Sequence, residues 1–187
     1  MEERSNSSGN KVNISTQKMT GGIGLILMVL GAVPKVGILL SIVSGVLLIV
    51  SIYQISNMLK KPAIFNRFII GFVLGLIGRI IALFFGLSNF VRIFVGIGMF
   101  SGMSIGIFFA IILFYIAIVA ANYFYKQAYS MLANALNHKL FSTGALLMFI
   151  GAITIILFGL GLILTLIGWI ILVVAFFTAP EEVEVVG

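Results

Sequence analysis

The chain has few charged residues and contains no cysteine and no aspartate. Only 9% of its 187 residues are charged, whereas a soluble domain usually carries about 25%. Hydrophobic residues make up 61%, and the mean hydropathy is +1.27. Such a composition cannot cover a protein surface for water, so the sequence predicts a protein that lies in a lipid bilayer.

Carboxylates are missing from most of the chain. All five acids lie at the two ends: Glu2, Glu3, Glu181, Glu182 and Glu184. Coupling to protons or sodium usually depends on carboxylates within the membrane, so their absence argues against a coupled transporter. The absence of cysteine excludes disulfides and thiolate chemistry. His138 is the sole histidine and has no acid or nucleophile near it in sequence, so we expect no metal site, no cofactor and no enzyme activity.

The long apolar segments predict helices that span a membrane. In lipid, only helices and closed barrels satisfy every backbone group, and the strands of a barrel would alternate apolar and polar residues. We therefore expect an all-α integral membrane protein with about six transmembrane helices, within a range of about four to seven. Its expected parts are a polar, disordered tail over 1–18, one transmembrane domain over 19–179, and an acidic tail over 180–187.

Two of the apolar segments are expected to fold as short helical hairpins. A single helix over 20–55 would be about 54 Å long, which far exceeds a hydrocarbon core of ~30 Å. Pro34 and Gly37 mark a turn within that segment. Gly159-Leu-Gly161 marks a second turn, within 143–178. The first hairpin arm is short and is either tilted or re-entrant.

A central pair of helices is expected between these hairpins. The third span covers about 68–87, and a break follows over 86–92. The apolar stretch that begins at 93 forms either one tilted helix or a short piece and a helix hinged near 101–104. From 123 to 140 the chain is amphipathic, which indicates a segment at or just outside the interface.

The two hairpins resemble each other in sequence. Leu27–Val33 reads against Leu147–Ile153, and Gly45–Val50 reads against Gly168–Val173 with three extra residues in the second turn. The match indicates an internal repeat of the kind found in transporters and channels. The alternative is chance, because low-complexity apolar segments match easily.

The basic residues set the expected orientation. With six helices, one side of the membrane receives eight of them and the other side receives Lys35 and Arg92. The positive-inside rule then places the richer side, with both termini, in the cytoplasm. Two patterns compete with this interpretation: Asn6 and Asn13 match the glycosylation pattern of an external tail, and 21–33 is as short as the apolar core of a signal peptide. The net charge of +6 comes from scattered residues and not from a dense patch, so we expect no nucleic-acid partner.

Small residues recur at helical spacing on two predicted helices. The first series is Gly71, Gly75 and Gly78, and the second is Gly98, Gly102 and Gly106, with Ser101 beside it. Such spacing lets helix backbones approach closely in lipid. The faces serve either packing within the monomer or contact with other membrane subunits or a second copy.

Arg79 is the one ionisable residue deep within a predicted span. An arginine at mid-bilayer costs about 2.5–3.5 kcal/mol on insertion scales, so it needs a physical reason. Counting from the turn places it level with 97–102, where Ser101 or glycine-exposed carbonyls accept its hydrogen bonds, unless it extends outward to the interface. The alternative is a site for an anion or a lipid headgroup that joins Arg79 with Arg92 and Lys35.

Several apolar motifs resemble a known family. They are Ser130–Leu136, Lys139–Ala152, Leu166–Leu172, and Gly21–Leu27 with Gly31–Pro34. Together they resemble the domain of unknown function 996 family, whose members are small membrane proteins, mostly archaeal. The resemblance implies a membrane protein from a prokaryote and implies no activity.

Two functional hypotheses remain from the sequence. The first is a non-catalytic structural or accessory subunit of a membrane complex, which would explain glycine-lined faces without any chemical constellation. The second is a passive transporter or pore for a small neutral or anionic solute, which would explain the repeat and Arg79.

Overall fold

The computed structural model describes residues 10–31, 37–94, 105–155 and 160–185, which form six helices and two short strands. The elements are, in chain order, β1 (Asn10–Asn13), α1 (Ser15–Leu30), α2 (Gly37–Met58), α3 (Pro62–Phe94), α4 (Ile105–Ala135), α5 (Leu140–Thr154), α6 (Leu160–Thr178) and β2 (Glu182–Val185).

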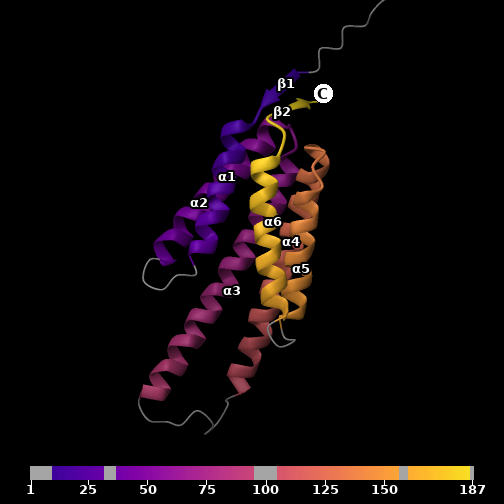
Figure 1. Cartoon of the computed structure of the whole chain (residues 1–187). Coiled ribbons are helices and arrows are strands. Elements are labelled where there is room, and N and C mark those ends of the chain that lie inside the picture. The colour runs from indigo at the N-terminus through magenta and orange to yellow at the C-terminus, as the bar shows by residue number, and fades with distance from the viewer. Residues whose placement is uncertain (1–9, 32–36, 95–104, 156–159, 186–187) are drawn as a thin grey trace, which may run out of the picture.

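The six helices form a ring. Each helix packs against the next one in the chain, and α6 packs against α1 to close the ring. Figure 1 shows the strands at one end, with α3 and α4 reaching farther than the other helices at the opposite end. Among the described residues, four helices are long and apolar enough to cross a membrane: Leu39–Met58, Pro62–Phe84, Phe109–Ala135 and Leu160–Thr178. The predicted class, an all-α membrane protein, is confirmed.

The central pair of helices is longer than the sequence predicted. Helix α3 has 33 residues and runs through the break expected over 86–92, so that prediction is wrong. Pro62 begins the helix, and the next proline in the chain is Pro180. Glycine, serine and asparagine within the helix each cost about 1 kcal/mol or less, which is too little to end it.

The segment before α1 is ordered from Asn10, which corrects the disordered tail expected over 1–18. Strand β1 pairs antiparallel with β2, and the Ile14 amide donates to the Glu181 carbonyl at 2.8 Å. Ile14 is fully buried. Val12 and Ile14 alternate with polar residues, which is the pattern of a strand with one covered face. Residues 1–9 lie outside the described part of the chain.

An aromatic cluster fills the end of the ring near the strands. It consists of Phe68, Tyr129, Phe141 and Phe176, whose rings meet at centroid distances of 5.0 to 6.4 Å. All four side chains are buried. Tyr129 belongs to the amphipathic segment that we expected at the interface. That segment instead continues α4 into the bundle, because its apolar residues share one helix face.

A candidate binding cavity lined by all six helices

The ring encloses a cavity of about 730 Å³, within the range of roughly 300–1,000 Å³ that is usual for ligand pockets. Every helix contributes to its wall. Representative residues, from α1 to α6, are Leu25, Leu48, Phe72, Tyr125, Met148 and Trp169. No single hairpin could form this wall, so the cavity depends on closure of the ring.

Within the described part of the chain, the cavity is closed at the strand end and exposed at the other end. Phe68, Tyr129 and Leu172 line its strand end, and all three are buried. Leu83 and Leu162 line the opposite end and are strongly exposed. The aromatic cluster therefore plugs one end, and the cavity has the form of a blind cup and not of a channel.

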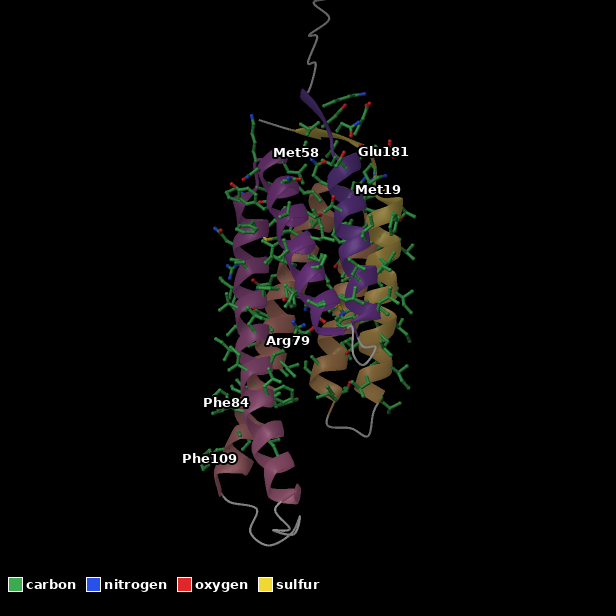
Figure 2. All side chains as sticks on the ribbon, turned by 90° about the vertical axis from the view of Figure 1, so that its left-hand side faces the viewer. Met19, Met58, Arg79, Phe84, Phe109 and Glu181 are labelled. Atoms are coloured by element: carbon green, nitrogen blue, oxygen red, sulfur yellow. The ribbon has the colours of Figure 1, made fainter. Side chains whose placement is uncertain are left out.

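Arg79 lines this cup on α3. Figure 2 shows it between the Met58 end of the bundle and the Phe84 end. Beside it, a Cβ at Gly78 would lie 3.5 Å from the Ala117 Cβ on α4. The prediction that residues 97–102 lie opposite Arg79 is therefore wrong. Helix α3 continues for four more turns beyond Arg79, and α4 begins at Ile105.

Arg79 has no carboxylate available in the membrane. The acids of the described chain are at its C-terminal end, and the two ion pairs among the described residues join Lys11 with Glu182 and Lys18 with Glu181. A guanidinium in a low-dielectric site interacts far more strongly with an anion than it would in water. Arg79 thus places a positive charge in the wall of the cup.

Two other polar groups of the wall are bonded within their own helices. Asn122 donates to the Ile118 carbonyl at 2.9 Å, and Thr165 donates to the Gly161 carbonyl at 2.8 Å. Trp169 differs, because its Nε1 is buried and has no acceptor among the described residues. Trp169 is the sole tryptophan of the chain, and no sequence pattern around it predicted a place in this wall.

Two members of the predicted anion site lie far apart along α3. Arg92 lies in the last turn of α3, about 20 Å along the helix axis from Arg79 at a rise of ~1.5 Å per residue. Lys35 lies outside the described residues. Arg79 is therefore the member of the predicted trio that the cavity holds.

The first glycine series faces α4. A Cβ at Gly71 would lie 2.9 Å from the Ala121 carbonyl oxygen, and one at Gly75 would lie 3.9 Å from the Ala121 Cβ. Close approach of α3 and α4 thus depends on Gly71 most directly. In the second series, Gly98, Ser101 and Gly102 lie outside the described residues. Gly106 lies in the first turn of α4.

Among the described residues, no group of three histidine, cysteine or acidic side chains is placed to hold a metal ion. His138, near the end that carries the strands, lies with its Nε2 3.0 Å from the Thr178 hydroxyl. The described wall of the cup offers a positive charge, hydrogen-bond donors and apolar surface.

These features define a helical membrane protein with a central cavity that, in the described part of the chain, is open at one end and has one cation in its wall. The chain belongs to a family of proteins of unknown function, DUF996, whose profile matches residues 40–170. It is similar to the uncharacterized protein MJ1644 of Methanocaldococcus jannaschii, with 29% identity over 179 residues that cover 93% of this chain and 97% of the relative. No solved structure matches the chain.

Proposed function

We propose that the protein is a non-catalytic, passive membrane carrier that binds a small anionic solute in the central cup. The observation that supports this most is Arg79, which lines a membrane cavity in a chain without a carboxylate between residues 5 and 180. An arginine at that depth carries an insertion cost of about 2.5–3.5 kcal/mol, and a bound anion would offset part of it. The lack of carboxylates supports passive exchange over ion-coupled transport.

The proposed orientation places the strand end in the cytoplasm. Lys11, Lys60, Lys61 and Arg67 belong to the segments at that end of the bundle. By the positive-inside rule, the open end of the cup then faces the outer side of a cell membrane. An anion would enter from that side and meet Arg79 before it reaches the aromatic plug.

Anion binding by purified protein in nanodiscs tests this proposal. Calorimetric titration with hexanoate should show one saturable site in the wild type. Hydrogen bonds to charged groups contribute about 1.5–3 kcal/mol, so Arg79→Gln should weaken binding by at least about tenfold. Arg79→Lys should retain part of the affinity.

Arg67→Gln is the matched control, because the Arg67 guanidinium lies 5.9 Å from the centre of the Phe124 ring and does not line the cup. It should bind hexanoate as the wild type does. Wild-type affinity in Arg79→Gln would contradict the proposal.

A second candidate, an accessory subunit of a membrane complex, has separate support. The far ends of α3 and α4 extend beyond the other helices (Figure 1) and expose Phe84 and Phe109 at 74% and 58%. A partner subunit or lipid would cover them. The α3 glycine series supports this candidate less, because Gly71 and Gly78 already pack on α4.

Crosslinking in native membranes, followed by mass spectrometry, tests the accessory role. A stoichiometric partner that is lost with Phe84→Ser and Phe109→Ser would support it. A free monomer in mild detergent, without any crosslinked partner, would count against it.

A further inference from the structure

We propose that the ligand of the cup is a single-chain amphiphile with an oxyanion head, such as an alkyl carboxylate or an alkyl phosphate. This inference rests on the proposed anion site and adds the chemical class of its ligand. The head would lie between Arg79 and Trp169, and the hydrocarbon chain would lie along the apolar wall.

The first argument is the position of the two donors. A side chain on a helix leans toward the N-terminus of that helix. Because α3 begins at the strand end, Arg79 leans toward that end. Because α6 begins at the opposite end, Trp169 leans toward that opposite end and away from the strands. Both residues line the cup and lean toward each other along its axis, so an oxyanion between them would accept hydrogen bonds from both.

The second argument is the unpartnered indole. The Trp169 Nε1 is buried without an acceptor among the described residues, although a buried tryptophan N–H usually has one. An apolar molecule would leave this donor unpaired. An oxyanion would satisfy it together with Arg79.

The third argument is the apolar wall. Leu25, Leu48, Phe72 and Met148 line the cup, and Leu83 lines its open end. A small hydrophilic anion such as acetate would leave this wall in contact with water. A hydrocarbon chain would cover it and exclude water from the Arg79 pair, which strengthens that pair.

The fourth argument is the shape of the cavity. At about 1.5 Å per residue, the lining residues of α3 from Phe68 to Leu83 span roughly 22 Å. The volume of about 730 Å³ is that of a drug-sized ligand. Spread over such a length, it accommodates one extended chain and is too narrow for the two chains of a membrane phospholipid.

Trp169 also provides the readout, because it is the sole tryptophan. In nanodiscs, 11-bromoundecanoate should quench its fluorescence saturably, and unbrominated dodecanoate should reverse the quenching. Bromoundecanol, which has the same chain without the charge, should give no saturable quenching. Bromopropionate, which has the same charge on a short chain, should bind at least tenfold more weakly.

Two variants control for ordinary lipid contact and for folding. Trp169→Phe combined with Ile170→Trp moves the fluorophore to a neighbouring side chain that is 58% exposed, where quenching should rise without saturation. Arg79→Gln should lose saturable quenching, whereas Arg79→Lys should keep part of it. Competition by dodecanoate against dodecyl phosphate identifies the preferred oxyanion.

The outcomes separate this inference from the proposed function. Equal affinity for bromopropionate and bromoundecanoate would overturn the amphiphile and leave the anion site standing. Unsaturable quenching at both tryptophan positions would overturn the amphiphile as well. Saturable quenching that survives in Arg79→Gln would overturn both.

Discussion

One lysine and one arginine side chain within the bundle are accommodated in different ways. Lys18 is buried, with only 6% of its surface exposed. Its Nζ donates to the Ala179 carbonyl at 2.8 Å and pairs with the Glu181 carboxylate at 3.2 Å. Arg79 lines a cavity and has no acid in its membrane span. A buried charge is usually paired or hydrogen-bonded. Lys18 thus has a structural role at the closure of the ring, whereas Arg79 lines the cavity without a carboxylate partner among the described residues.

Lys18→Met should destabilise the protein. The substitution removes the bond to Ala179 and leaves a buried carbonyl unpaired, which costs about 1–3 kcal/mol. Thermal unfolding in detergent should show a clearly lower midpoint. Lys11→Met is the control, since the Lys11 pair with Glu182 spans 3.7 Å and both side chains are 62% exposed, a setting usually worth about 0–1 kcal/mol. Equal midpoints for the two variants would contradict a structural role for Lys18.

At the scale of helices, the spacing of the glycines predicted contacts between helices better than the pattern of charges did. The series at Gly71, Gly75 and Gly78 was visible in the sequence, and the structure places it against α4. The residues of α4 that lie opposite this series could not be predicted from the sequence. They depend on where α3 ends, and the weak breakers near 86–92 misled the sequence analysis because no proline enforces a turn there.

The hairpins α1–α2 and α5–α6 use corresponding contacts. Gly31 lies against Ser41 as Gly151 lies against Thr165, and Gly24 lies against Leu48 as Gly144 lies against Leu172. In these pairs, each contact residue of α6 comes 124 positions after its counterpart in α2. This offset is one position more than in the sequence match of Gly45 with Gly168. The internal repeat stays a prediction, and its best alignment follows these contacts.

Gly71→Ala and Gly75→Ala should differ in their effect on stability. A Cβ at Gly71 would meet the Ala121 carbonyl oxygen at 2.9 Å, so α3 and α4 would have to separate. At Gly75 the contacts begin at 3.9 Å, and alanine has the higher helix propensity by about 1 kcal/mol. We expect Gly71→Ala to lose roughly 1–3 kcal/mol by overpacking and Gly75→Ala to be neutral or slightly stabilising. Unfolding in mild detergent measures both, and the reverse order would contradict the α3–α4 register.

At the scale of the whole molecule, the sequence predicted the membrane class and the approximate helix number. It did not predict the ring. The seam between α1 and α6 joins residues from opposite ends of the chain, and no local pattern specifies such a contact. The strand pair was missed because four-residue strands in polar tails carry little signal, although Val12 and Ile14 alternate as Val183 and Val185 do.

The paired strands predict a specific crosslink. Lys11 and Glu184 are opposite each other in the register, and opposed antiparallel residues lie about 4.5–5.5 Å apart, within disulfide range. Since the chain has no cysteine, Lys11→Cys with Glu184→Cys should oxidise to one intramolecular disulfide, visible as a gel shift that a reductant reverses. A disordered tail would instead crosslink Lys11→Cys with Lys60→Cys as readily.

The blind cup itself is tested most directly by thiol labelling at Ile118, which lines the cavity on α4. Ile118→Cys is the only thiol in its chain, so a membrane-impermeant reagent reports access to the cup alone. We expect labelling to be much faster from the side opposite the termini, to which the cup opens, than from the side of the termini, which a carrier would expose only in its other conformation. Dodecanoate should protect the thiol, and Arg79→Gln should abolish that protection. Equally fast labelling from both sides would show an open pore, and absence of labelling from both would show that no accessible cup exists. Either result would contradict the account.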